Sequence, residues 1–178
     1  MAEAFSNKLA RAVGVVNSST GGSIGITTNL ITGISTTGVT VADLVETGNY
    51  LAGTKVSSIG AGQVVVDRDS TNTAASSSQN VKFLTPHTLY TSTGLKTILI
   101  GGTFANNTNG QVGLTVEVTD TSASITVAVA SKIPVPAGSS FVISDTGKTL
   151  LESGDSIKIY CDTANAIDAN ISILTGVN

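Results

Sequence analysis

The chain has 178 residues, of which 40% are hydrophobic, 12% charged and 4% aromatic. This length and hydrophobic content suit one ordinary domain or two small ones with a packed core, and they exclude a disordered chain. The formal net charge is −3, and the nine Lys and Arg residues are scattered, so we expect no nucleic-acid partner. No apolar run is long enough for a signal peptide or a membrane span, so we expect no membrane partner.

Residues 1–19 are expected to form an N-terminal arm. Its segment NKLARAV is long enough for one or two helical turns at most. Phe5 and Leu9 are apolar, and Lys8 and Arg11 are basic. Such an arm could hook onto a neighbour while its cations meet acidic patches. The alternative is a frayed terminus.

The region 20–85 contains short β-branched segments separated by glycines. The candidate strands are SIGIT, GVTVADLV, TKVSSIG, QVVVDRD and NVKFLT, with a polar loop, STNTAASSSQN, before the last. Strands this short predict a small β-barrel-like or curled-sheet unit. We expect TPHTLYTSTG to contain a linker over 86–94, because Pro86 interrupts strand pairing.

The region 95–178 alternates apolar and polar residues with a period of two. The apolar positions are Ile98 and Ile100; Val112, Leu114, Val116 and Val118; Ile125, Val127 and Val129; Phe141 and Ile143; Ile157, Ile159 and Cys161; and Ile167, Ala169, Ile171 and Ile173. The turn-forming sequences between them are NNTNG, TDTSA, PVPAGSS, SDTGK, ESGDS and DTANA. Short connections and one-sided strands predict an antiparallel, jelly-roll-like β-sandwich. The predicted fold class is therefore all-β.

Cys161 is the only cysteine and the first candidate for a reactive group. A nucleophilic cysteine needs a neighbouring histidine, a cation or a helix N-terminus to lower its thiol pKa. Cys161 instead lies in register with Ile157 and Ile159, which favours a core residue. One cysteine also allows no internal disulfide.

His87 is the only histidine and lies in the expected linker, which favours an exposed or interface residue over a general base. One histidine and one cysteine exclude a closed Cys/His zinc site within one chain. The segment DRDSTN has alternate carboxylates, Asp67 and Asp69, and an amide, Asn72, a combination that could bind calcium. It lacks the glycine and the distal glutamate of an EF-hand loop, so a solvated turn is the better interpretation.

We therefore predict a protein that is not an enzyme, with no catalytic, cofactor-binding or metal-ligating residue and no cofactor. The low charge leaves a surface rich in Ser, Thr, Asn and Gly, which repels other copies only weakly. Small β-units with few aromatics gain stability by covering strand edges and apolar surface. The composition thus favours a homo-oligomer.

The quoted turns and strands resemble small β-rich structural proteins of tailed bacteriophages, in particular those infecting marine cyanobacteria and related hosts. The similarity lies in LIGGTFANNTNGQVGLTVEV, ASKIPVPAGSSFVIS and KTLLESGDSIKIYCDTANAIDANISIL, and in the module VADLVETGNYLAGTKVSSIGAGQVVVDRDST. Its motifs are Asn107–Thr108, the turns Pro134–Ser140 and Leu151–Ser156, and the final strand Ser172–Leu174. It covers most of 39–175 and omits the segment before Gly38.

The resemblance implies a virion component without catalytic residues, such as a capsid decoration or cement protein. It implies contacts with the major capsid protein and assembly in the host cytoplasm. Closed symmetry would favour a trimer at threefold positions of the head. The alternative is a neck, tail or fibre protein that binds a host receptor or glycan, with Tyr50, Tyr90 and Tyr160 as the available aromatics. A hydrolase acting on the host envelope would need an acid pair or a triad, and the sequence indicates neither.

Overall fold

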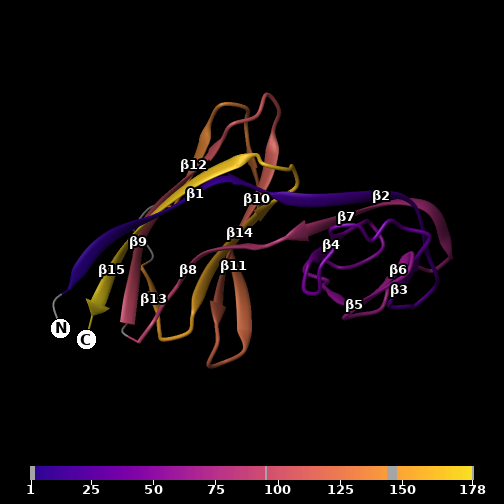
Figure 1. The fold of residues 1–178 in the computed structure, drawn as a ribbon, viewed down its shortest axis with the longest axis horizontal. Coiled ribbons are helices and arrows are strands. Elements are labelled where there is room, and N and C mark those ends of the chain that lie inside the picture. The colour runs from indigo at the N-terminus through magenta and orange to yellow at the C-terminus, as the bar shows by residue number, and fades with distance from the viewer. Residues whose placement is uncertain (1–2, 95, 144–147, 178) are drawn as a thin grey trace. The chain divides into compact units, whose positions relative to one another are not determined.

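The computed structural model describes residues 3–94, 96–143 and 148–177, and these residues form fifteen strands and no helix (Figure 1). The strands are β1 Ala4–Val13, β2 Val15–Ile24, β3 Leu30–Thr32, β4 Leu44–Glu46, β5 Val56–Gly60, β6 Gln63–Val66, β7 Ser76–Thr85, β8 His87–Thr91, β9 Lys96–Asn106, β10 Val112–Asp120, β11 Ile125–Val135, β12 Ser140–Ile143, β13 Thr149–Leu151, β14 Ser156–Cys161 and β15 Ile167–Val177. The predicted all-β class is confirmed. No helix that could cross a membrane occurs within the described ranges.

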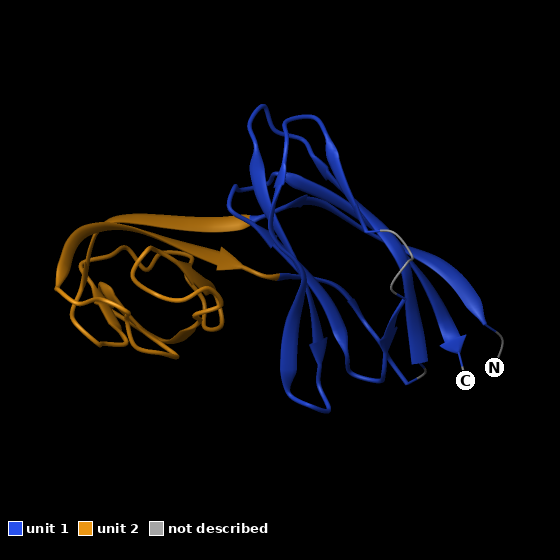
Figure 2. Ribbon diagram, turned by 180° about the vertical axis from the view of Figure 1, so that it is seen from behind, with its two compact units in different colours: residues 1–14, 87–178 blue, residues 15–86 orange. Residues whose placement is uncertain are grey.

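The chain divides into two compact units (Figure 2). Unit 1 comprises Met1–Gly14 and His87–Asn178, and unit 2 comprises Val15–Pro86. The chain thus starts in unit 1, leaves it to build unit 2, and returns to finish unit 1. This division differs from the expected order of an arm, a small domain, a linker and a sandwich.

The expected arm and linker both contain strands of unit 1. β1 pairs with β15 from Ala4 opposite Thr175 to Val13 opposite Ile167, with a register shift after Ala10. β8, in the expected linker, pairs with β14. The partner of each strand lies far away in the sequence, so local patterning gave no sign of the pairing. The short helix considered for NKLARAV is replaced by β1.

Unit 1 is a β-sandwich-like pair of antiparallel sheets. The first sheet has the order β1-β15-β9-β12, and β13 also pairs with β9; the second has the order β11-β10-β14-β8. Residues of both sheets form one buried cluster, which includes Phe104, Leu114, Ile159 and Ile171. Phe141 packs against that cluster with its ring centroid 6.3 Å from that of Phe104.

Most of the alternation predicted for unit 1 matches the buried side. The predicted apolar residues of β10, β14 and β15 are all buried, and Phe141 and Ile143 pack against the cluster. In β9 the buried aliphatic residue is Leu99, whereas Ile98 and Ile100 are only partly buried. Both faces of this strand carry apolar side chains, so alternation alone does not predict which face is buried. A register shift against β15 at this point determines it. The expected turn SDTGK lies mostly outside the described residues, which resume at Lys148.

β11 departs from the expectation of a buried face. Ile125, Val127 and Val129 share one side of the strand as predicted, but their exposed fractions are 55%, 55% and 44%. Val127 lies opposite the buried Val118 of β10. β11 is an edge strand of its sheet, so its side chains have neighbours on one flank only.

Unit 2 is a curled six-stranded sheet with the order β4-β7-β2-β3-β6-β5. It is not closed into a barrel: its edge strands meet only through an isolated bridge between Leu44 and Lys55 and nearby backbone hydrogen bonds. The inner side carries its own core, in which Ile24, Ile31, Val64 and Phe83 are fully buried.

Strand limits in unit 2 follow pairing more than composition. β2 begins inside the expected arm, and β7 begins at Ser76 inside the expected polar loop. These two strands pair with each other from Val15 opposite Thr85 to Ile24 opposite Ser76. The segment 38–43 of GVTVADLV is irregular instead of extended, because buried Asp43 closes a turn there through Thr40.

Candidate functional site

Cys161 is a core residue, as its register predicted. It is 1% exposed, and its Sγ donates to the carbonyl oxygen of Thr163 at 3.0 Å. Burial raises the pKa of the Cys161 thiol, which disfavours the nucleophilic thiolate. Gly14, with φ of 124°, packs against this thiol so closely that a Cβ there would collide with it. The thiol therefore fills space at the end of β1.

His87 lies in β8, opposite Ile159 of β14, and is exposed. Within the described ranges, no group of three His, Cys, Asp or Glu side chains is placed to hold a metal ion.

The segment DRDSTN forms hydrogen bonds with other segments of unit 2. Asp67 accepts a hydrogen bond from the Lys55 backbone N–H at 2.9 Å and lies 3.5 Å from Arg68. Ser70 donates to the Gly25 carbonyl oxygen at 2.9 Å, and the Asn72 amide reaches Ser76 Oγ at 3.3 Å. Asp67 and Asn72, two of the three side chains that suggested a cation site, are thus engaged in hydrogen bonds within unit 2.

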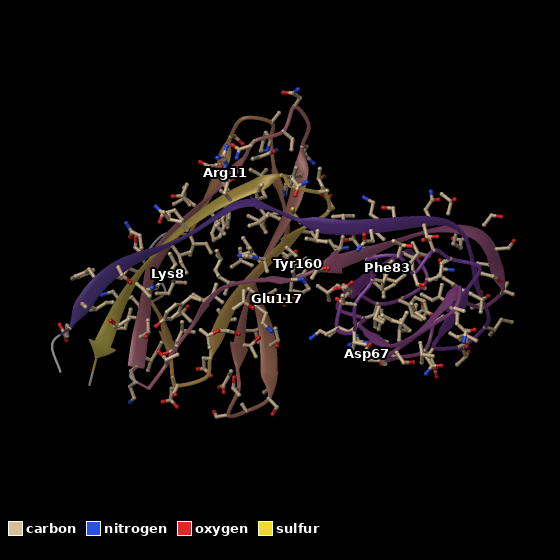
Figure 3. All side chains as sticks on the ribbon, in the orientation of Figure 1. Lys8, Arg11, Asp67, Phe83, Glu117 and Tyr160 are labelled. Atoms are coloured by element: carbon tan, nitrogen blue, oxygen red, sulfur yellow. The ribbon has the colours of Figure 1, made fainter. Side chains whose placement is uncertain are left out.

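Each of the three tyrosine hydroxyls has a hydrogen-bond partner within the protein. Tyr50 is buried, donates to the Thr28 carbonyl oxygen at 3.0 Å, and has a pKa raised to about 12 by desolvation first and the charge of Asp69 second. Tyr160 donates to Glu117 Oε1 at 2.7 Å on the outside of the second sheet (Figure 3). Tyr90 packs against the core, and its hydroxyl is 3.0 Å from Thr97 Oγ1.

Lys8 is not a free cation of a mobile arm. It lies in β1 opposite the buried Ile171, and its Nζ is 5.6 Å from the centroid of the Tyr90 ring. This distance is that of a cation–π contact. Lys8 thus stabilises the sandwich, while the other cation of the segment, Arg11, is exposed (Figure 3).

A polar groove of about 540 Å³ lies between the loops 106–109 and 137–140. The buried Asn106 builds it: its amide donates to the carbonyl oxygens of Gly110 and Val135 at 2.7 and 2.9 Å, and its Oδ1 accepts from Thr108. The rim side chains are uncharged amides, hydroxyls and Ala137. Of the expected Asn107–Thr108 motif, Thr108 donates to Asn106 Oδ1, and the Asn107 backbone N–H donates to the Ala166 carbonyl oxygen.

The largest unexplained feature of unit 1 is the face of its first sheet that points away from the core, which we call the outer face. Directly paired residues share a side of a sheet. Phe5 pairs with Leu174, Leu174 with Ile98, and Ile98 with Leu150. Four apolar side chains thus form a continuous row across β1, β15, β9 and β13, which we call the apolar row.

A second row on the outer face mixes apolar and polar side chains. It runs from Leu9 through Asn170 and Thr103 to Val142. Between the two rows, Ser172 donates to Asn7 Oδ1 at 2.9 Å. The exposed fractions are 76% for Phe5, 75% for Leu9, 57% for Val142 and 48% for Leu150. Exposed apolar side chains gathered in this way mark an interaction surface.

A hollow of about 540 Å³ lies on the same face. It is lined by Leu9, Ala10, Arg11, Thr103, Ala105, Asp168, Ala169 and Asn170. Asp168 accepts a hydrogen bond from the Ala12 backbone N–H at 2.7 Å, which fixes its carboxylate beside β1. The sequence pointed to Phe5, Leu9 and Arg11, but not to Leu150, Val142 or Leu174, since only strand pairing places these on one face.

Comparisons of the chain with models of known protein families, with curated proteins and with solved structures found no significant match. The functional proposal therefore rests on the geometry of the described residues and on the resemblance of the sequence motifs.

Proposed function

We propose that this protein is a non-enzymatic structural component of a tailed-bacteriophage virion, most simply a capsid decoration or cement protein. It acts by associating with copies of itself and by contacting the major capsid protein or other virion proteins. A trimer at threefold positions of the head is the assembly that closed symmetry favours.

The observation that carries this proposal is the outer face of the first sheet. Its most exposed apolar residues, Phe5 and Leu9, stand on a paired strand instead of a free arm. A surface of this kind supports an assembly role because it leaves apolar area to be buried by a partner. The structural use of Cys161, Asp67 and the tyrosines also supports a scaffold more than a catalyst.

The similarity of the turn motifs to phage structural proteins supports the virion assignment. The structure gives these motifs scaffold roles: Asn106 and Thr108 build one loop, and Asp155 of the ESGDS turn accepts from the backbone N–H groups of Thr121 and Glu152. Rigid loops on a sandwich suit a protein that must stay folded on a particle surface.

The test is the number of copies per purified virus particle, measured by calibrated mass spectrometry against the major capsid protein. Hundreds of copies would support a decoration or cement protein. A few to a few tens would move the protein to the neck, baseplate or fibres. Absence from particles would overturn the virion proposal.

A second candidate function is glycan or receptor binding by a neck, tail or fibre-associated protein, and the polar groove favours it. Asn107, Thr108, Asn109, Ser139 and Ser140 offer amides and hydroxyls around one concavity. The groove lining contains no aromatic ring for a sugar to stack on. Binding on a glycan array that is lost in Asn109→Ala and Ser140→Ala would favour this candidate, and an array without hits would remove its support.

A further inference from the structure

The outer face of the first sheet has the size of a protein–protein interface. Four strands lie side by side across it, and β15 runs along it for 11 residues. With strands about 4.8 Å apart and a rise of about 3.4 Å per residue, this face covers roughly 650 Å². Two such faces in contact would bury about 1,300 Å², which exceeds the roughly 1,000 Å² expected of a specific interface.

The charges of the outer face permit contact between two copies. The charged residues that line the hollow are Arg11 and Asp168, which have opposite signs. Beyond the apolar row, Lys96 pairs with Val177 at the start of β9, and Glu3 and Lys148 directly precede β1 and β13, so both signs occur again. A surface with this balance does not repel its own copy, and Arg11 of one chain can pair with Asp168 of another.

The shape of the outer face is also suited to a copy of itself. Phe5 and Leu9 project from β1 with about three quarters of their side chains exposed. The hollow beside them is lined on this face by the side chains of Thr103 and Ala105, whereas Ala10 and Ala169, which also border it, turn their side chains to the core. The same surface thus carries both a bulky apolar projection and a recess, which an isologous pair of chains would use twice.

We propose that two copies of this chain pair through their outer faces, sheet against sheet, around a twofold axis. The projecting Phe5 and Leu9 of each chain are buried against the recess and the apolar row of the other. The two sheets pack face to face as in a β-sandwich, and the side chains of both outer faces fill the layer between them. This inference rests on the proposed assembly role and names the surface that self-association uses; a threefold assembly would need an additional contact elsewhere.

The first test is sedimentation equilibrium of the full chain over a range of concentrations. The native protein is expected to form dimers, and Phe5→Glu and Leu9→Glu are expected to raise the dissociation constant at least about tenfold, as for central interface residues. Val127→Glu is the matched control, because Val127 is 55% exposed but lies in β11 of the other sheet. Circular dichroism verifies that all three variants are folded.

The second test reports on the twofold axis. β15 lies inside the outer face, so Ser172→Cys and Asn170→Cys place a thiol near the centre of the pair. The native Cys161 is buried and cannot cross-link two chains. Oxidation is expected to give a disulfide-linked dimer with at least one of these variants and none with the native protein.

The outcomes separate this inference from the proposed function. A native chain that stays monomeric at high concentration, or a dimer unaffected by both Phe5→Glu and Leu9→Glu, would overturn the pairing. A trimer that these variants dissociate but that neither cysteine cross-links would overturn the twofold arrangement. A monomer found in hundreds of copies per particle would refute the pairing and leave the virion role intact. A dimer that is absent from particles would refute the virion role and leave the pairing intact.

Discussion

At the residue scale, buried carboxylates in both units act as acceptors for backbone N–H groups. Asp155 is 5% exposed and accepts from Thr121 N–H at 2.9 Å and Glu152 N–H at 2.8 Å. Its own backbone carbonyl accepts from Ser92 at 2.8 Å. Asp43 has the same role in unit 2, where it accepts from Thr40. Both carboxylates thus hold loops in place through hydrogen bonds.

We expect Asp155→Ala to lower the free energy of unfolding of unit 1 by about 2 kcal/mol, because two N–H groups lose the charged acceptor of a buried carboxylate. Glu152→Ala is the control, since the Glu152 side chain is exposed and only its backbone joins this cluster. The measurement is calorimetric unfolding of both variants. Equal stability of the two would contradict the role assigned to Asp155.

Cys161 should be chemically silent while the protein is folded. Because burial raises the pKa of the thiol above the ordinary value of 9.0, iodoacetamide is expected to modify it slowly in native buffer and rapidly in denaturant. The raised pKa also means that this group stabilises the fold below pH 9.0, and that its contribution is lost as the pH rises further. Mass spectrometry of the alkylated chain follows the reaction, and fast labelling of native protein would argue against burial.

At the scale of the strand, burial depends on neighbours and not on alternation alone. β10 and β11 pair with each other and both alternate apolar residues. β10 also pairs with β14 and is buried, whereas β11 has an open edge. The side chains at that edge are exposed, namely those of Ile125, Val127 and Val129. The alternation of a strand therefore predicts which side chains share a face, but not whether other residues bury that face.

Two matched substitutions measure this difference. Val116→Ala removes a side chain that is 1% exposed and is expected to cost about 2 kcal/mol, from lost burial and the cavity left behind. Val127→Ala removes the same atoms at a largely exposed position and is expected to change stability by less than about 0.5 kcal/mol. The measurement is the free energy of unfolding of the two variants by denaturant. A similar loss of stability in both would mean that the side chains of β11 are buried in solution.

At the scale of the whole molecule, unit 2 is inserted in the chain of unit 1. The insertion begins and ends in neighbouring strands, because Val15 of β2 lies opposite Thr85 of β7. Opposed residues of an antiparallel pair have Cα atoms about 5 Å apart. The two ends of the insertion are therefore close, and each unit has its own buried cluster.

Replacing residues 15–86 by a linker of about three glycines and serines should leave unit 1 folded, since a short loop can join ends that were neighbours. We expect the excised protein to keep dispersed amide signals and a cooperative thermal transition. The fragment 15–86 expressed by itself provides the complementary sample. Loss of cooperative unfolding in the excised protein would show that unit 1 needs unit 2.

What the sequence alone determined is the all-β class, the turns at NNTNG, TDTSA and ESGDS, and the buried faces of β10, β14 and β15, including Cys161. These follow from period-two alternation and turn residues, which are local properties. Only the tertiary structure decided that residues 4–13 and 87–91 are strands of the sandwich, that β11 is exposed, and that Phe5, Leu174, Ile98 and Leu150 form one row. Each of these depends on pairing between segments far apart in the chain, and such pairing leaves no signal in the strands taken one at a time.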